Sequence, residues 1–160
     1  LAQKDIDADW TKKNGERHLG YKDHVKCDAD SKLITNYSVT SASVHDSQRC
    51  LVFIGQEDEV LYADSAYSGK PIALAQPENC KNQICEKEYR NSPLTSEQKM
   101  NNCRKSRIRC RIEHIFGFMT GAMHGITIRS IGITRAWMNI GITNLVYNFC
   151  RYSYLKRASA

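Results

Sequence analysis

Apolar and polar residues alternate along two early stretches, residues 17–27 and 33–40, and this alternation predicts two strands. The turn-forming residues 28–31 separate them, so we expect a β-hairpin. A third stretch, residues 60–63, is apolar throughout and ends at Asp64, which is typical of a strand buried on both faces. Shorter elements are expected around it: a helix over 43–54, a helix over 70–75 and a strand over 83–86.

The second half of the chain carries helical periodicity. Thr95 and Gln98 resemble a capping box, which predicts the start of a long helix. Along that helix, apolar residues recur on one face in a stripe that predicts packing on a core: Ile108, Ile112, Ile115, Phe116 and Met119. Residues 136–154 are apolar almost all round, so we expect a second, buried helix there. Strands early and helices late favour a mixed α/β fold.

Length and composition place the chain among globular proteins. Its 160 residues are enough for one domain, which we expect over residues 17–160 after a polar segment over 1–16. No run of 18 apolar residues occurs, so the sequence predicts no transmembrane helix. The seven cysteines include no CxxC pair, so we expect neither a zinc site nor a disulfide framework. They are interpreted as reduced, mostly buried thiols of a cytoplasmic protein.

Charge adds a candidate partner. Lys and Arg outnumber Asp and Glu by 23 to 17, and the resulting net charge of +6 favours polyanions such as nucleic acid. Five of the basic residues lie between Cys103 and Arg111 with no acid among them: Arg104, Lys105, Arg107, Arg109 and Arg111. Such a run fits phosphate binding and a solvated helix face equally well.

Two acids are candidates for chemistry. Asp64 follows the apolar strand at its carboxyl end, where ligands bind in open α/β sheets, and Mg²⁺ prefers carboxylate oxygens. The alternative is that Asp64 caps its loop through the amides of Ala66 or Tyr67. Glu113 is the only acid after Glu97; it fits either a surface ion pair with Arg109 or a metal site beside bound phosphates.

Two other motifs give weaker evidence for a catalytic or phosphate-binding site. The His45–Asp46 pair could orient a general base, but no Ser or Cys nucleophile accompanies it convincingly, so a cap beside a solvated histidine is the preferred interpretation. The loop over residues 65–69 lacks the Gly-Lys-Ser/Thr ending of a P-loop.

Several segments, in order, resemble motifs of bacterial insertion-sequence transposases with a DDE catalytic domain. The similarity extends from about residue 9 to residue 156. The segments are Trp10-Thr11-Lys12-Lys13-Asn14-Gly15, residues 19–24, Val39-Thr40 through Val44-His45-Asp46-Ser47, Tyr62-Ala63-Asp64-Ser65-Ala66-Tyr67, and Arg109-Cys110-Arg111-Ile112-Glu113-His114-Ile115-Phe116-Gly117.

The resemblance implies a ribonuclease-H-like mixed sheet flanked by helices. It implies three acids that hold two Mg²⁺ ions, with Mn²⁺ as a substitute, for DNA strand cleavage and strand transfer at the ends of a mobile element. The second acid maps onto Asp64, the third onto Glu113, and the family's preceding Arg onto Arg109. Ser106 and Thr120 stand where the family has a Tyr and a Lys. DNA is the implied partner, in the cytoplasm at the nucleoid, with a homo-oligomer in the active complex and no membrane.

The family's first acid has no counterpart among the quoted motifs. It belongs to a first strand upstream of the Trp10 segment, whereas Asp5, Asp7 and Asp9 lie in a polar segment, and Asp28 and Asp30 match hairpin acids. We therefore expect a partial catalytic domain that lacks its first strand and is inactive alone. The alternatives are a non-catalytic DNA-binding remnant and a metal-dependent nuclease of the same fold. We also expect Asp64 and Glu113 to lie within about 10 Å of each other, close enough to share metal ions.

Overall fold

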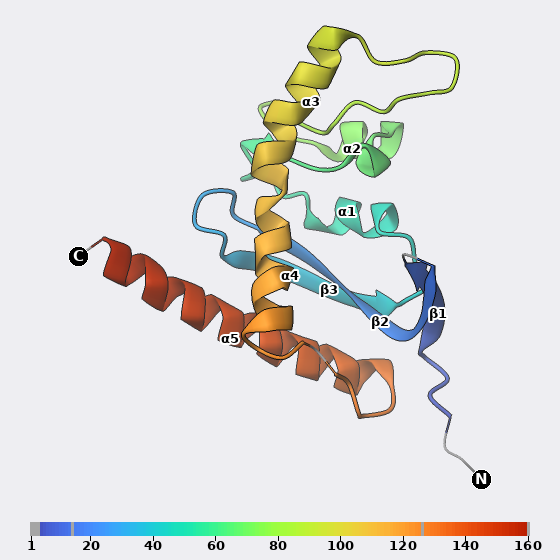
Figure 1. Ribbon diagram of the computed structural model, residues 1–160, viewed down its shortest axis with the longest axis vertical. Coiled ribbons are helices and arrows are strands. Elements are labelled where there is room, and N and C mark those ends of the chain that lie inside the picture. The colour runs from blue at the N-terminus through green and yellow to red at the C-terminus, as the bar shows by residue number, and fades with distance from the viewer. Residues whose placement is uncertain (1–3, 14, 126, 160) are drawn as a thin grey trace. The chain divides into compact units, whose positions relative to one another are not determined.

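The computed structural model describes residues 4–13, 15–125 and 127–159 (Figure 1). It is a mixed α/β structure with two small sheets and helices. The chain divides into two compact units. Unit 1 comprises Leu1–Asp46 and His114–Ala160, and unit 2 comprises Ser47–Glu113. In the described ranges, no helix is both long enough and apolar enough to cross a membrane.

Unit 1 contains a three-stranded antiparallel sheet in the order β1-β2-β3. Strand β1 spans Asp9–Lys13, β2 spans Glu16–Cys27 and β3 spans Ile34–Ser41. The expected hairpin of β2 and β3 is confirmed, with Asp23 paired to Val39. Strand β1 lies within the segment expected to be merely polar, and its mostly exposed residues pair with the first half of β2.

Two helices complete unit 1. Helix α4 (Arg111–Gly121) enters it at His114, and Ile115 and Met119 are its fully buried residues, as the apolar stripe predicts. Helix α5 (Ile133–Ala158) packs against β2 and β3. It approaches β3 closely, because a Cβ atom at Gly141 would overlap the Tyr37 hydroxyl.

Hydrogen bonds fix α5 against β3 and the hairpin turn. The Asn148 amide accepts from the Ile34 N–H and donates to the Ile34 carbonyl, both at 2.8 Å. The Tyr147 hydroxyl donates to the Lys32 carbonyl at 3.0 Å, and Arg151 Nε donates to the Ser31 carbonyl at 2.7 Å. These bonds join the C-terminal half of the helix to backbone more than 100 positions earlier in the chain.

We expect Asn148→Asp to lower the free energy of unfolding by about 1–3 kcal/mol, because a carboxylate cannot donate to the Ile34 carbonyl. Urea denaturation at pH 7.5 measures the effect. Asn139→Asp is the control on the same helix: its exposed side chain donates to the Ser130 hydroxyl, so we expect a change under about 0.5 kcal/mol. Equal losses in the two variants would contradict the proposed importance of the Asn148 contacts.

Unit 2 contains a two-stranded parallel sheet of β4 and β5, in which Val60 pairs with Lys81 and Leu61 with Asn82. The backbone bond from Cys85 N to Ala63 O, at 3.0 Å, extends this pairing beyond the strands. The elements of unit 2 are α1 (Ser47–Phe53), β4 (Val60–Leu61), the 3₁₀ helix η1 (Ser65–Tyr67), α2 (Lys70–Ala75), β5 (Lys81–Asn82) and α3 (Ser96–Arg109).

The elements of unit 2 are shorter than the sequence predicts. Strand β4 has two residues, and Val60 is 39% exposed, so the expectation of a strand buried on both faces is wrong. The strand expected over 83–86 instead lies at Lys81–Asn82. The long helix begins at the predicted capping box but is interrupted at Cys110, where Glu113 N bonds the Cys110 carbonyl in a tight 3₁₀-like turn.

Two expectations about burial are also wrong. All seven cysteines are free thiols as expected, but only Cys50 and Cys85 are buried, and Cys103 and Cys150 are exposed. Helix α5 is buried on one face only; large apolar side chains on its other face are exposed. A helix that meets a sheet on one side buries one stripe, however apolar the rest of its surface is.

Candidate active site

Asp64 occupies the turn between β4 and η1. Its side-chain Oδ1 accepts from the Ser65 N–H at 2.6 Å, and its carbonyl accepts from the Tyr67 N–H at 2.9 Å. The capping role considered for Asp64 is therefore present, through Ser65 rather than through the two amides that follow. The neighbours Ala63 and Tyr67 pack against the core of unit 2, which consists of Cys50, Ile72 and Ile84. This packing holds the exposed carboxylate at the carboxyl end of β4.

Glu113 lies in the first turn of α4, where the helix dipole favours a negative charge. Its Oε1 accepts from Arg109 Nη2 at 3.0 Å, so the ion pair considered from the sequence is present. The Glu113 side chain remains 61% exposed. It is therefore accessible to a cation or to a phosphate-bound metal.

Helix α3 is joined to the chain segment that follows β5. Lys105 Nζ donates to the Ile84 carbonyl at 3.0 Å, and the Asn102 amide bonds both backbone groups of Glu86. Cys85 Sγ lies 3.7 Å from Ser106 Oγ. Since Cys85 N also bonds the Ala63 carbonyl, Cys85 connects α3 to the residue before Asp64.

Glu113 follows Ser106 by seven positions, across the interruption of the helix at Cys110. The contacts around Cys85 join the segment before Asp64 to α3, and Asp64 and Glu113 both belong to unit 2. In the hydrogen bonds of the structure, however, the Asp64 carboxylate binds the Ser65 amide and the Glu113 carboxylate binds Arg109.

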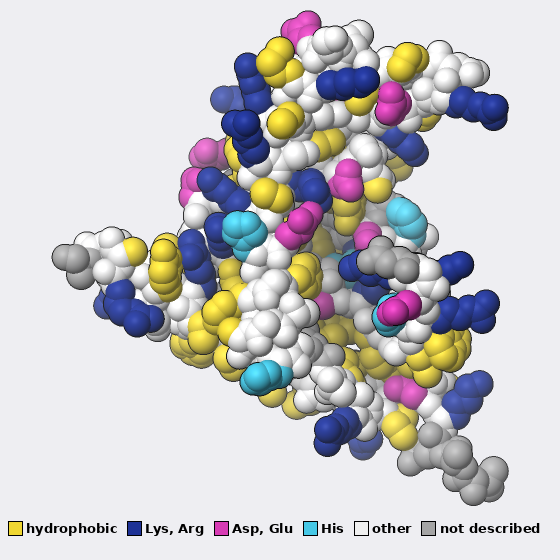
Figure 2. Space-filling model, in the orientation of Figure 1, with side chains coloured by type: hydrophobic (Ala, Val, Ile, Leu, Met, Phe, Trp, Pro, Cys, Tyr) yellow, Lys and Arg dark blue, Asp and Glu magenta, His cyan; other side chains and the backbone are white. Residues whose placement is uncertain are grey.

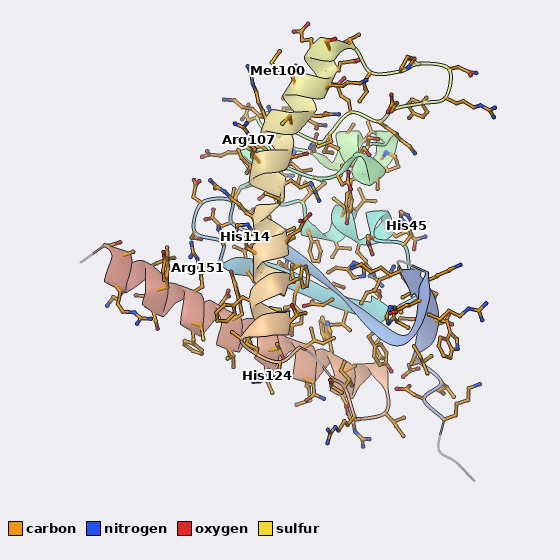
Figure 3. The ribbon with its side chains drawn as sticks, in the orientation of Figure 1. His45, Met100, Arg107, His114, His124 and Arg151 are labelled. Atoms are coloured by element: carbon orange, nitrogen blue, oxygen red, sulfur yellow. The ribbon has the colours of Figure 1, made fainter. Side chains whose placement is uncertain are left out.

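The five basic residues of the run play different parts. Lys105 is 17% exposed and its ammonium is held by the Ile84 carbonyl and by Glu86, 3.8 Å away, so its role is to fix α3. Arg109 is bound to Glu113, and Arg111 is half-buried. Arg104 and Arg107 are exposed one turn apart on α3, where Lys and Arg side chains gather in Figure 2 and where Figure 3 labels Arg107.

Comparison with known proteins decides the family. The chain matches the family "Transposase DDE domain" over residues 2–149. It belongs to the DDE transposase family. The transposase for insertion sequence element IS1106 of Neisseria meningitidis serogroup B is 32% identical over 117 residues, 71% of this chain. The match covers only 40% of that relative. No solved structure matches the chain.

Family membership confirms the resemblance drawn from the motifs. DDE transposases generally depend on divalent metal ions, so the ligands that this chain can offer to such an ion become important. Asp64 and Glu113 are exposed carboxylates, and such oxygens suit Mg²⁺, which commonly takes one or two carboxylates and completes its shell with water or phosphate. Over residues 4–13, 15–125 and 127–159, no group of three or more His, Cys, Asp or Glu side chains is arranged to hold a metal ion. The carboxylates of Asp64 and Glu113 thus have the donor chemistry that a divalent cation prefers, while no larger ligand group surrounds either of them in these ranges.

The acids at the start of this DDE-family chain have structural contacts in unit 1. Asp5 accepts from the Tyr21 hydroxyl at 2.8 Å and from the Gly132 N–H at 3.2 Å. Asp7 accepts from the Ile133 N–H at 3.0 Å. Burial and the bond to Asp5 raise the pKa of Tyr21 to about 12. Asp5 and Asp7 thus attach the N-terminal segment to the first turn of α5, where negative charge is favourable.

The sequence analysis did not predict a chain of side-chain contacts that joins Thr40, His24 and Asp46. His24 Nε2 lies 2.8 Å from Thr40 Oγ1, and His24 Nδ1 lies 3.7 Å from Asp46 Oδ1, which also pairs with Lys22 at 3.3 Å. The order Thr40–His24–Asp46 resembles a nucleophile–base–acid triad. Thr40 is only 2% exposed, so a substrate cannot reach its hydroxyl, and the relay stabilises unit 1. The alternating side-chain directions of β2 and β3 bring these residues together, which local sequence pattern does not reveal.

Proposed function

We propose that this chain is part of the catalytic domain of an insertion-sequence transposase that cleaves and joins DNA at the ends of a mobile element. The observation that carries the proposal is the combination of family and position: Asp64 and Glu113 lie within the residues that match the family, 2–149, and in one compact unit. Asp64 follows a sheet strand, and Glu113 follows a helix joined to that sheet through Cys85.

Asp64 and Glu113 are the residues that would hold Mg²⁺ or Mn²⁺. When bound, such a cation polarises the phosphodiester and lowers the pKa of a coordinated water or hydroxyl. The Ser65 amide orients one oxygen of Asp64. Arg109 neutralises Glu113 in the metal-free protein, so we expect the cation to compete with Arg109 for that carboxylate.

Arg104 and Arg107 are proposed as the principal phosphate contacts of α3, with Arg109 and Arg111 shaping the adjacent surface. We expect Arg104→Ala/Arg107→Ala to weaken binding of duplex DNA and to lower the slope of log affinity against log salt by about 2. Fluorescence anisotropy from 25 to 200 mM NaCl measures both quantities. Arg90→Ala, an exposed cation outside α3, should leave the slope nearly unchanged. An unchanged slope in the double variant would remove α3 from the DNA-binding surface.

A second candidate is a DNA-binding remnant without catalysis, and the present contacts of the two acids favour it, since Asp64 binds the Ser65 amide and Glu113 binds Arg109. Assays of plasmid nicking and strand transfer with Mg²⁺ or Mn²⁺, run beside Asp64→Ala, test the 160-residue chain. We expect salt-sensitive DNA binding without cleavage, because the family's two-metal chemistry uses three acids and only Asp64 and Glu113 are assigned to it in this chain. Cleavage that disappears in Asp64→Ala would show that another acid of the chain completes the site. Absence of DNA binding even at low salt would overturn both candidates.

A further inference from the structure

Helix α5 has a second apolar face besides the one that packs on the sheet. The buried face carries Ala136, Ile140, Asn144 and Tyr147. The outward face carries five large side chains that are each between 53% and 65% exposed: Met138, Ile142, Leu145, Phe149 and Tyr152. We name these five residues the α5 stripe. Burying side chains of this size is worth roughly 1.5–3 kcal/mol each, so their exposure marks a surface that favours a partner.

The spacing of the α5 stripe identifies the kind of partner. Its members are separated by four, three, four and three residues, which is the heptad repeat of a coiled coil. Side chains at this spacing insert as knobs into the holes of a facing helix. The positions beside the stripe are uncharged, namely Asn139, Gly141, Val146, Asn148, Ser153 and Leu155. No charge repulsion along the flanks therefore opposes the pairing of two identical helices.

The charges at the ends of α5 determine the favoured direction of such a pair. The helix contains no acid, and Lys156 and Arg157 lie in its last turn. A parallel pair would bring these cations of two copies together, whereas an antiparallel pair separates them and opposes the two helix dipoles favourably. In an antiparallel heptad register, Ile142 of one copy faces Leu145 of the other.

The same register places Met138 of one copy opposite Phe149 of the other. At the ends of the stripe, Arg135 of one copy meets the Tyr152 ring of the other, an arrangement that supplies a cation–π contact. In this register, the apolar residues Met138, Ile142, Leu145 and Phe149 of one copy all face apolar residues of the other copy. Tyr152, at the end of the stripe, faces a cation.

The area of the α5 stripe is sufficient for a weak dimer. Five half-exposed side chains present about 500 Å² per copy, or about 1,000 Å² for two copies, which is the lower limit for a specific interface. We propose that two copies of this chain associate through the α5 stripe as an antiparallel helix pair. The helix is already held in place by its contacts with β3, so association does not require it to fold.

Sedimentation equilibrium of the 160-residue chain between 5 and 200 µM tests the proposal. We expect a reversible monomer–dimer equilibrium whose midpoint lies within this concentration range, as suits an interface at the lower limit of specific ones. Ile142→Glu and Leu145→Lys should each weaken dimerisation at least tenfold, because each buries unpaired charges in the pair. Tyr154→Glu is the control: Tyr154 is a large exposed residue of α5 outside the stripe, so we expect it to leave dimerisation unchanged.

Mixing the two charged variants tests the direction of the pair. An antiparallel dimer of one Ile142→Glu chain and one Leu145→Lys chain sets Glu against Lys in one layer and Leu against Ile in the other, so we expect dimerisation to be restored. Circular dichroism of each variant is the control for correct folding. A chain that stays monomeric at 200 µM, a dimer unaffected by the single variants, or a mixture that does not associate would overturn the proposal. Protection of the stripe in a monomeric, longer transposase would likewise overturn it, by showing that another segment of the same polypeptide covers it.

Discussion

Asp64→Asn and Glu113→Gln are each expected to lower transposition by more than about a thousandfold, in a transposase polypeptide that carries this chain together with the flanking segments of its relatives. Each substitution keeps the size of the side chain and removes its negative charge, so the divalent cation loses a charged ligand at the reacting phosphate. The assay counts marked elements transferred to a target plasmid in cells.

Glu88→Gln is the matched control, because Glu88 is an exposed acid of the same unit that lies outside both motifs. We expect it to transpose within about twofold of the unmodified protein. DNA binding measured in parallel should be retained in all three variants, since the proposed phosphate contacts lie on α3. Transposition by Asp64→Asn or Glu113→Gln within tenfold of the unmodified level would remove that residue from the catalytic site.

Asp23→Asn is expected to stabilise the protein by about 3 kcal/mol at pH 7.5. Asp23 lies on β2 and accepts a hydrogen bond from Asn144 Nδ2 of α5 at 3.3 Å. The other oxygen of each side chain, Asp23 Oδ2 and Asn144 Oδ1, is buried and has no hydrogen-bond partner in the described structure. Protonation of Asp23 removes the cost of keeping a buried, charged oxygen without a partner.

The pKa of Asp23 accords with that geometry. Burial raises it to about 6 from an ordinary value of 3.8, and the hydrogen bond from Asn144 offsets part of the increase. The protonated acid is therefore favoured in the folded protein, and the contribution of Asp23 to stability is greatest below about pH 4. Stability falls as the pH rises from about 4 to about 6, because the unfolded chain ionises more readily than the folded one. A difference of about two pKa units corresponds to about 3 kcal/mol.

An Asn side chain at position 23 cannot ionise, so the buried site stays uncharged at every pH, and its carbonyl oxygen can still accept from Asn144 Nδ2. Urea denaturation at pH 4 and pH 7.5 therefore separates removal of a buried charge from a stabilisation that does not depend on pH. We expect the substitution to raise the free energy of unfolding at pH 7.5 and to change it little at pH 4. Glu16→Gln on the same strand, where the side chain is 81% exposed, should show no such pH dependence. Destabilisation of Asp23→Asn at pH 7.5 would mean that the carboxylate is ionised and satisfied in the folded protein.

Local sequence patterns predicted the elements whose stability is local. The hairpin turn at 28–31 and the capping box at Thr95 and Gln98 form as expected, because each depends on residues a few positions apart. The Arg109–Glu113 ion pair follows from helical spacing in the same way. Local pattern also singled out Asp64 and Glu113 as candidates, and the order of the motifs assigned them to the metal site, which stays a prediction.

The failures depend on contacts between distant residues. From the sequence, Lys105 is one cation of a basic run. In the structure, however, its ammonium donates a hydrogen bond to the Ile84 carbonyl, 21 positions away. Helix α5 is apolar on more than one side, and its sequence does not indicate which stripe meets the sheet. The buried Asp23–Asn144 pair likewise joins residues 121 positions apart, so no local pattern reveals it.

Paramagnetic broadening by Mn²⁺ in the NMR spectrum of the 160-residue chain tests most directly whether Asp64 and Glu113 share a cation. We expect the amide signals around Asp64 and around Glu113 to broaden together at the same low Mn²⁺ concentration. In Asp64→Asn, and equally in Glu113→Gln, both sets of signals should recover together. Broadening that centres on the acidic segment Asp5–Asp9, or that affects only one of the two regions, would contradict the assignment of Asp64 and Glu113 as a joint metal site.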